Sequence, residues 1–276
     1  MRDANNMKRL IQHWLAILLA TALALPTQAA DKNTLRLATT TSTSNTGLLD
    51  YLLPKFEQKC GCKVNVISVG TGKALKLGED GNVDVVLVHA RPSEDAFVAA
   101  GHGIDRRDVM YNDFVLVGPN NDPARIKGEK DVLAAMKKIA DTRWRFVSRG
   151  DDSGTDQMEK GYWKALGIKP EGKWYSSAGQ GMGEVLMMAG EMRAYTLTDR
   201  GTYITYRDKI GLPILVEGDA KMFNPYGIIA VSPKKYPDIN YQGAIQLIGW
   251  ITSPEGQRLI GEFKVGGEQL FTPSAK

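Results

Sequence analysis

Apolar and polar positions along the chain change repeatedly between a strand pattern and a helix pattern. Short apolar runs suited to buried strands occupy residues 35–38, 63–69, 83–88, 114–117 and 144–147. Segments with apolar residues three or four positions apart, which favour helices, occupy residues 47–59, 126–140 and 157–166, and a short helix is expected at residues 73–78. Because the two patterns alternate, the sequence predicts an α/β fold built from βαβ units.

Two apolar strands flank the middle third of the chain, one at residues 113–117 and one at residues 226–231. We expect the chain to cross between two lobes at these strands, which would act as a hinge. Lobe I would contain residues 31–113 and 227–276, and lobe II residues 114–226. Small ligands usually bind between domains and at the carboxyl ends of parallel strands, so we expect a ligand cleft between the lobes.

The first 30 residues have the pattern of a cleavable signal peptide. Lys8 and Arg9 precede an apolar run from Leu10 to Leu25, and small residues around Ala29 and Ala30 provide a cleavage site. A plain N-terminal membrane anchor is the alternative, but the run is short for a span and ends in Pro and small residues. We therefore expect residues 1–30 to be a signal peptide and the mature protein to be periplasmic.

Net charge argues against a nucleic-acid partner. The whole chain carries +4, and residues 1–30 hold three basic residues and one acidic residue, so the mature protein carries +2. Nucleic-acid-binding proteins usually carry a larger positive charge, so this net charge does not indicate one.

The two cysteines are Cys60 and Cys62. Export permits a disulfide between them, but two reduced thiols are an equal alternative, and the pair is weak evidence for a metal site.

Two segments more than a hundred residues apart combine hydroxyls with a strand-to-helix transition. The first, residues 39–47, has six hydroxyl residues in a row, and the second, residues 149–155, joins Arg149 to Ser153, Gly154 and Thr155. One or two hydroxyls would suffice to cap a helix, so the surplus suits an acceptor-only ligand. Helix starts and a guanidinium both favour an anion. Together the segments predict a site for an oxyanion.

Other residues near these segments have two interpretations each. Thr71, between two glycines at a strand end, is either part of a common turn or a further ligand contact. One of Asp151 and Asp152 is expected to pair with Arg149, and the other to cap the following helix. The alternative is that Asp151 accepts a proton from the ligand. Around Tyr195, Thr198 and Arg200 the chain either reaches the cleft or forms a local ion pair between Asp199 and Arg200. No set of residues combines a nucleophile, a base and an orienting group.

Several motifs together resemble the periplasmic tungstate-binding proteins of ABC transporters. The resemblance begins with the threonine-rich run at residues 38–49 and covers nearly all of the mature chain. The matching motifs are Val69-Gly70-Thr71-Gly72-Lys73-Ala74, Asp84–His89, Ser148–Thr155, Ala194–Gly201 and Asn224-Pro225-Tyr226. The resemblance implies the two-lobed periplasmic-binding-protein fold (type II), an oxyanion ligand and delivery of that ligand to a membrane permease.

Carried over residue by residue, the resemblance implies a site without catalytic residues, metal ligands or cofactors. Its oxyanion ligand would be tungstate or molybdate. The implied ligand residues are Thr40, Thr41, Ser42, Arg149 and Thr155, with Thr71 and Ser153 as additions and Thr39, Gly154, Tyr195 and Thr198 as further candidates. Phosphate is the alternative ligand, because phosphate-binding proteins share the pattern at residues 149–155, although their first loop lacks the threonine run. A phosphate-ester hydrolase is the rival enzyme class. We expect a monomer that partners the permease subunits.

Overall fold

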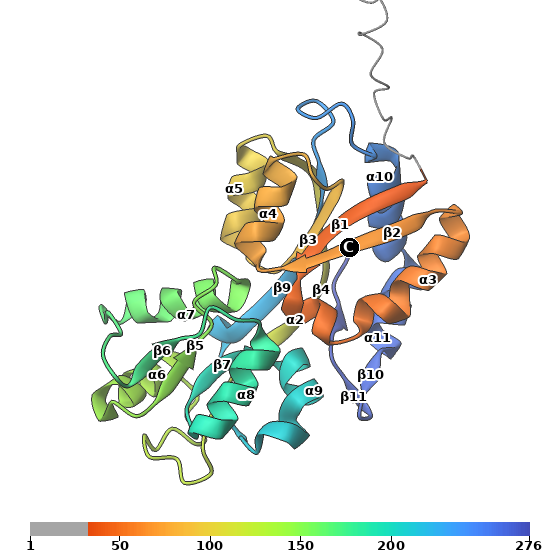
Figure 1. Cartoon of the computed structure of the whole chain (residues 1–276). Coiled ribbons are helices and arrows are strands. Elements are labelled where there is room, and N and C mark those ends of the chain that lie inside the picture. Colours follow the sequence, from red (N-terminus) through yellow and green to blue (C-terminus); the bar gives the residue numbers. More distant parts are fainter. Residues whose placement is uncertain (1–32) are drawn as a thin grey trace, which may run out of the picture. The chain divides into compact units, whose positions relative to one another are not determined.

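A central sheet organises the protein, of which the computed structural model describes residues 33–276. The expected signal peptide (residues 1–30) lies outside the described residues. The strand order is β12-β4-β9-β3-β1-β2, and β7 and β8 pair with the far end of β4 (Figure 1). These strands are β1 (Thr34–Thr40), β2 (Lys63–Val69), β3 (Val85–Val88), β4 (Gly103–Val117), β7 (Thr196–Asp199), β8 (Ile214–Val216), β9 (Phe223–Val231) and β12 (Thr272–Pro273). The predicted α/β fold is confirmed.

Helices connect and cover these strands. They are α2 (Thr41–Asn45), α3 (Leu48–Cys60), α4 (Thr71–Glu79), α5 (Arg91–Ala99), α6 (Val132–Thr142), α7 (Gly154–Ala165), α8 (Met182–Met192), α9 (Arg200–Ile210), α10 (Tyr241–Ile251), α11 (Pro254–Glu262) and the short 3₁₀ helix η1 (Ala220–Met222). Two small pairs complete the fold: β5 (Phe146–Ser148) with β6 (Tyr175–Ser177), and β10 (Lys264–Val265) with β11 (Glu268–Gln269).

The long strand β4 changes partners along its length. From Gly103 to Asp113 it pairs with β9, and from Phe114 to Val117 it pairs with β7. Strand β9 in turn pairs with β3 from Gly227 onward. We use "first lobe" for β1–β3, α2–α5, α10 and α11, and "second lobe" for β5–β8 and α6–α9. The strands β4 and β9 join the lobes (Figure 1).

The first lobe is built on three parallel strands. Strand β1 pairs in parallel with both β2 and β3, and β3 is buried along its whole length. Such all-apolar strands are expected where helices cover both faces of a parallel sheet. Helix α3 buries Leu48, Leu52 and Phe56 against this sheet. Because parallel strands end at the same edge, the residues that follow β1, β2 and β3 are brought together.

The second lobe has its own aromatic core around α7. Trp163 is 2 % exposed, and its ring packs edge-on against Phe146 with ring centroids 5.7 Å apart. Glu159 is buried in this core and accepts hydrogen bonds from Trp163 Nε1 at 2.9 Å and Tyr175 OH at 2.7 Å. Burial raises the pKa of Glu159 to about 7 even though these donors favour its ionised form.

Three predicted helix boundaries were wrong. Residues 126–131 are not helical, and α6 begins at Val132 after Asp131, whose side chain accepts from Leu133 N. Ile126 is buried in the same core as α6 and extends the apolar period, but Gly128 has φ 81° and turns the chain before the helix starts. Helices α4 and α7 begin earlier than predicted, at Thr71 and Gly154.

A disulfide joins Cys60 and Cys62, whose Cα atoms are 5.2 Å apart. The structure therefore has the disulfide and not the two reduced thiols that the sequence left as an equal alternative.

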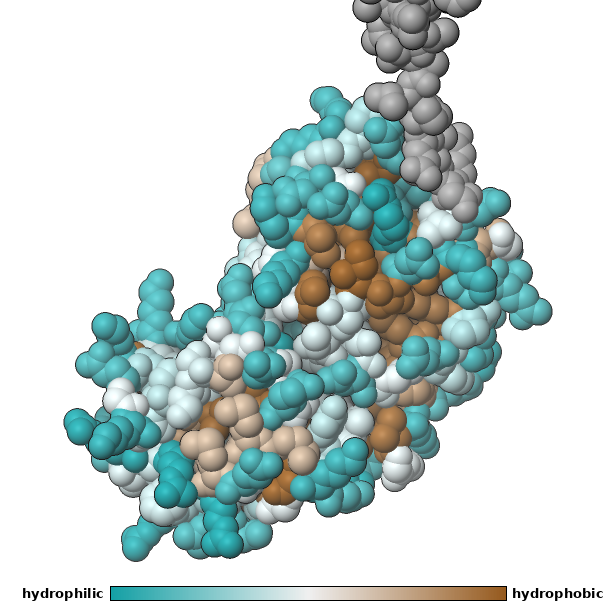
Figure 2. All heavy atoms as spheres, viewed as in Figure 1, coloured by the Kyte–Doolittle hydropathy of each residue, from teal (hydrophilic) through white to brown (hydrophobic). Residues whose placement is uncertain are grey.

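Strand β2 lies at the free edge of the sheet. Figure 2 shows apolar residues gathered over β2 on an otherwise largely polar face, and Val66 of β2 is 37 % exposed.

The buried carboxyl of Glu159 makes a prediction about pH. The pKa in the folded state is about 7, against an ordinary value of 4.5, so unfolding releases a proton between these values. The free energy of unfolding should therefore fall as pH rises from about 4.5 to 7. Glu159→Gln removes this dependence and should stabilise the protein above pH 7 by on the order of 3 kcal/mol. Urea unfolding of both proteins at several pH values measures this free energy of unfolding.

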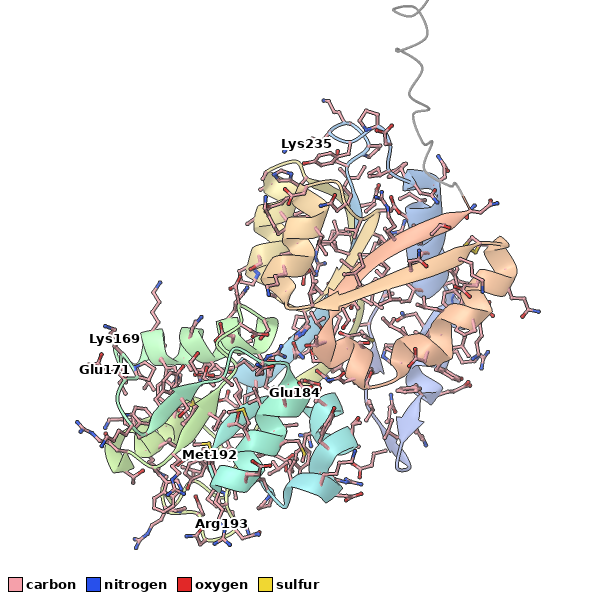
Figure 3. The ribbon with its side chains drawn as sticks, viewed as in Figure 1. Lys169, Glu171, Glu184, Met192, Arg193 and Lys235 are labelled. Carbon is pink, nitrogen blue, oxygen red and sulfur yellow. A yellow bond between two sulfur atoms is a disulfide. The ribbon has the colours of Figure 1, made fainter. Side chains whose placement is uncertain are left out.

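The matched control is Glu171→Gln, because Glu171 lies at the outer edge of the second lobe beside Lys169 (Figure 3). Its side chain is 74 % exposed, so this substitution should leave the pH profile of stability unchanged. Equal pH profiles for wild type and Glu159→Gln would contradict the prediction.

Candidate functional site

Polar residues gather where β1, β2 and β3 end. Thr40 ends β1, Thr71 follows β2, and His89 follows β3. Thr41–Asn45 form the short helix α2 rather than the simple turn that we expected from the sequence. Ser42 and His89 come together at this edge, with Oγ and Nε2 3.1 Å apart.

Three hydroxyls of this edge contact one another. Thr40 Oγ1 lies 3.0 Å from Ser42 Oγ and 2.7 Å from Thr43 Oγ1, and it accepts from Thr43 N as the N-cap of α2. All three residues are buried. We use "hydroxyl cluster" for Thr40, Ser42 and Thr43.

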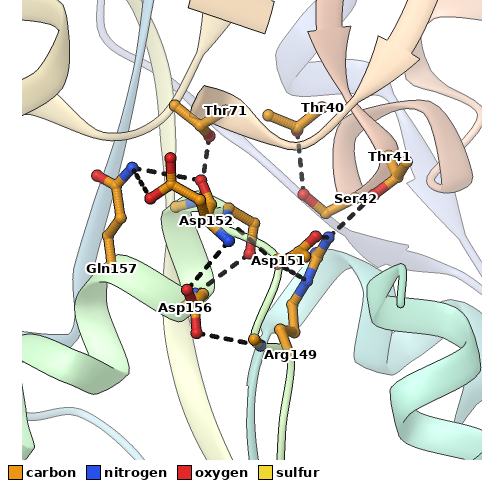
Figure 4. Close-up of polar contacts among 12 residues, drawn as sticks. Thr40, Thr41, Ser42, Thr71, Arg149, Asp151, Asp152, Asp156 and Gln157 are labelled. Atoms are coloured by element: carbon orange, nitrogen blue, oxygen red, sulfur yellow. Dashed lines mark hydrogen bonds and ion pairs between the residues drawn. The ribbon is translucent and has the colours of Figure 1, made fainter. Parts of the chain in front are cut away.

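Arg149 approaches the hydroxyl cluster from the second lobe. It is 1 % exposed. Its Nε and Nη2 donate to the two carboxylate oxygens of Asp151 at 3.2 and 2.5 Å, and Nη2 also donates to Thr41 Oγ1 at 3.2 Å (Figure 4). Within the described residues, Arg149 Nη1 and Thr155 Oγ1 are buried and have no hydrogen-bond partner. A buried donor without an acceptor is costly, so both atoms indicate a place for a ligand.

The expected pairing of Asp151 with Arg149 is therefore present. Burial alone would raise the pKa of Asp151, but hydrogen bonds from Arg149 and the charge of its guanidinium hold that pKa below its usual value. The second half of the expectation was wrong, because Ser153 caps α7 by accepting from Asp156 N. Asp152 instead accepts from Gln157 Nε2.

The loop before α7 is held by a carboxylate from inside that helix. Asp156 is fully buried, accepts from the backbone N–H groups of Gly150 and Asp152, and pairs with Lys160 at 2.5 Å. These bonds fix the loop that carries Arg149.

Direct hydrogen bonds join the two lobes around this loop. Gly154 N donates to Thr71 Oγ1 at 3.1 Å (Figure 4). Gly72 N donates to Asp152 O at 3.2 Å. A Cβ at Gly72 would lie 2.0 Å from Asp152 Oδ2. The lobes are thus in close contact at the site, and glycines permit that approach.

His89 links the hydroxyl cluster to the strands that join the lobes. Its Nδ1 is 3.0 Å from Asn224 Oδ1 on β9, and its ring stacks on Tyr226 with centroids 4.7 Å apart. Burial lowers the pKa of His89 to about 4, with a further lowering by the charge of Arg149 against a raising influence of Asp199. The imidazole is therefore neutral near pH 7.

Four candidates from the sequence use their polar groups elsewhere. Thr39 Oγ1 donates to Leu87 O, and Thr198 Oγ1 donates to Asp199 O. The Tyr195 hydroxyl donates to Asp122 and accepts from Ala124 N. Arg200 pairs with Asp113 and Glu217, not with Asp199 as the alternative interpretation held.

Three residues of the site were missed from the sequence, namely Thr43, His89 and Asp156. The sequence places no other histidine or hydroxyl residue beside His89 to mark it as part of a site. The signal in the sequence that could have identified His89 is its position directly after the buried strand β3, at the edge of the sheet where β1 also ends.

The arrangement offers several hydrogen-bond donors. Arg149 brings a guanidinium with an unpartnered Nη1, hydroxyls line the opposite side, and Gly70, the N-cap of α4, makes no side-chain capping bond. Within residues 33–276, no group of three or more His, Cys, Asp or Glu residues could hold a metal ion. Chemically the site can hold an acceptor-rich anion.

Comparisons with known proteins agree with this arrangement. The family model described as a PBP superfamily domain matches residues 26–255. The tungstate-binding protein TupA of Peptoclostridium acidaminophilum is 50 % identical over 98 % of this chain and 99 % of its own length. The chain belongs to the family of tungstate-binding proteins in the PBP superfamily.

Two solved structures in this family match the fold. The crystal structure of the tungstate ABC transporter from Geobacter sulfurreducens shares 55 % identity and a TM-score of 0.77, covering 84 % of this chain and 99 % of that chain. The tungstate-binding protein TupA from Desulfovibrio alaskensis G20 shares 49 % identity and a TM-score of 0.74, covering 88 % and 99 %. In this family member, no helix among the described residues is long and apolar enough to span a membrane.

The close approach at Gly154 can be tested by adding a single carbon. A Cβ there would lie 2.8 Å from His89 O and 2.9 Å from the imidazole. Gly154→Ala should therefore weaken the contacts between the lobes by roughly 1–3 kcal/mol. Amide hydrogen exchange at Gly72, whose N–H bonds to the other lobe, should become faster.

Gly161→Ala is the matched control on the same helix. A Cβ at Gly161 meets nothing within 4 Å, so exchange at Gly72 should stay as in the wild type. Unchanged exchange in Gly154→Ala would show that this approach does not limit contact between the lobes.

Proposed function

We propose that this protein binds tungstate between its two lobes and delivers it to the permease of an ABC transporter. The ligand residues are Thr40, Thr41, Ser42, Thr71, Arg149, Ser153 and Thr155. The observation that carries the proposal is the pair of buried, unpartnered atoms Arg149 Nη1 and Thr155 Oγ1. The names of the family members support tungstate as the ligand.

The donor set explains why a deprotonated dianion suits the site. Tungstate near neutral pH accepts hydrogen bonds and donates none, and hydroxyls and a guanidinium can all donate to it. The one carboxylate beside Arg149 is that of Asp151, and both of its oxygens already accept from the guanidinium. It therefore orients Arg149 and does not act as an acceptor for a ligand proton.

Capture and release would follow movement of the lobes. We place the lobe boundaries where the crossing strands change partners, with residues 31–113 and 227–276 in one lobe and 114–226 in the other. Thr41 and Arg149 meet across the lobes at 3.2 Å, so closure would complete the site and exclude water. Exclusion of water strengthens the electrostatic contacts to the anion.

The same proposal covers transport outside the cytoplasm. Residues 1–30 would direct export and be removed, leaving a periplasmic monomer. The Cys60–Cys62 disulfide fits an oxidising compartment. Tungstate bound between the lobes would then be handed to membrane permease subunits.

Removing the guanidinium tests the site directly. Arg149→Ala should weaken tungstate binding by roughly 2–5 kcal/mol, because it deletes a charged donor from a desolvated site. Calorimetric titration with tungstate measures the loss. Arg258→Ala is the control, because Arg258 lies on the surface of α11 in an exposed pair with Glu262. Equal tungstate affinity in Arg149→Ala and wild type would remove Arg149 from the site.

Competition with phosphate tests the choice of anion. Phosphate near neutral pH partly retains a proton, and a proton without an acceptor is costly in a buried site. Tungstate should therefore bind more tightly by at least ~3 kcal/mol. Asp151→Asn should weaken tungstate binding through lost orientation of Arg149, without creating a preference for tungstate. Stoichiometric displacement of bound tungstate by phosphate in moderate excess would overturn both the anion and the role of Asp151.

A further inference from the structure

His89 controls whether the hydroxyl cluster can donate outward. The amide of Asn224 has contacts of its own, since Nδ2 donates to Asn112 Oδ1 at 2.7 Å and to Tyr226 OH at 3.2 Å. Asn224 Oδ1 therefore faces His89 Nδ1 at 3.0 Å, and Nδ1 carries the hydrogen. In a neutral imidazole the other nitrogen, Nε2, is then an acceptor.

With Nε2 as an acceptor, the hydrogens of the hydroxyl cluster are all used internally. The three hydroxyls supply three hydrogens. Three contacts consume them: Ser42 to His89 at 3.1 Å, Thr40 to Ser42 at 3.0 Å and Thr40 to Thr43 at 2.7 Å. A dianion would then face oxygen lone pairs and not hydroxyl hydrogens, which is unfavourable.

A hydrogen on Nε2 reverses this balance. The contact between His89 and Ser42 would then use the imidazole hydrogen, the two hydroxyl contacts would use two hydroxyl hydrogens, and one hydroxyl hydrogen would be free for the anion. Building on the proposed function, we propose that oxyanion binding is coupled to proton uptake at His89 Nε2, which turns the hydroxyl cluster into a donor toward the bound anion.

The surroundings of His89 can accommodate an imidazolium without rearrangement. Nδ1–H would keep Asn224 Oδ1 as its acceptor, and Nε2–H would gain Ser42 Oγ. The alternative, a neutral ring with its hydrogen moved from Nδ1 to Nε2, would require the amides of Asn224 and Asn112 to turn together and Tyr226 OH to donate to Asn224.

Charged groups around the imidazole favour uptake once an anion is present. Arg149 lowers the pKa of His89, and Asp199 raises it. A bound dianion would offset the charge of Arg149 and add negative charge of its own. The other groups in contact with the ring are neutral, namely Ser42 of α2, Phe114 of β4, Gly154 of α7, and Asn224 and Tyr226 of β9.

A cavity lies next to His89. It has a volume of about 500 Å³ and is bordered by Gln157, Tyr162 and Phe223.

The coupling predicts a pH-dependent affinity. The pKa of His89 in the free protein is about 4, and it must be higher in the complex. Tungstate affinity should therefore rise as pH falls from the pKa of His89 in the complex toward its pKa in the free protein, by up to about tenfold per pH unit. Calorimetric titrations from about pH 8 to pH 6, in buffers with different ionisation enthalpies, measure both the affinity and the protons taken up.

The expected result is proton uptake, approaching one per tungstate at the lower pH, in the wild type and in His102→Gln. His102 is the matched control because it lies outside the site, stacked on Phe97. His89→Gln should bind tungstate more weakly, with no proton uptake and little pH dependence. Uptake that persists in His89→Gln, or a wild type that binds tungstate without uptake, would overturn the coupling.

Nuclear magnetic resonance of ¹⁵N-labelled wild type gives a second measurement that does not depend on a variant. When tungstate is added, the Nε2 signal of His89 should move from that of an unprotonated nitrogen to that of a protonated one, while the Nδ1 signal stays that of a protonated nitrogen. An unprotonated Nε2 in the complex would refute the proposal. Failure of the wild type to bind tungstate at all would instead refute the proposed function, so the two failures are distinguishable.

Discussion

The burial of a single guanidinium constrains the rest of this structure. A buried charge is costly unless it is paired and hydrogen-bonded. Arg149 is 1 % exposed, and Asp151 neutralises it through two nitrogens while Nη1 stays unpartnered. The loop must therefore be held firmly, which Asp156 achieves from within α7. In the proposed site, the side chain that binds the anion is thus also a buried charge that the empty protein must accommodate.

The two lobes contribute different chemistry to one site. The parallel strands of the first lobe end in neutral hydroxyls, whereas the second lobe brings the charge. Neither lobe alone surrounds an anion with donors. His89 connects this division to the crossing strands, because it touches both Ser42 and Asn224. In the proposed site, His89 is therefore the side chain through which a change at Ser42 on ligand binding would reach Asn224 on β9.

Much of this arrangement could be predicted from the sequence, for identifiable reasons. Apolar strand runs gave the α/β fold, and hydroxyls at strand ends located Thr40, Ser42 and Thr71 because parallel strands share an edge. The exact helix boundaries and the partners of several side chains depend on tertiary packing and could not be predicted. Ile126 belongs to a core without belonging to a helix, and the hydroxyl of Tyr195 is bound by residues that follow a different strand. His89 had no neighbour in sequence that could reveal its partners.

The partner change along β4 has a mechanical consequence. One continuous strand pairs with β9 up to Asp113 and with β7 from Phe114, so the backbone passes between lobes without an intervening flexible loop. The twist between neighbouring strands is larger in a two-stranded ribbon than in a wide sheet. Closure around an anion, as proposed, would therefore have to change the twist of β4 and β9, because no loop between the lobes can take up the movement.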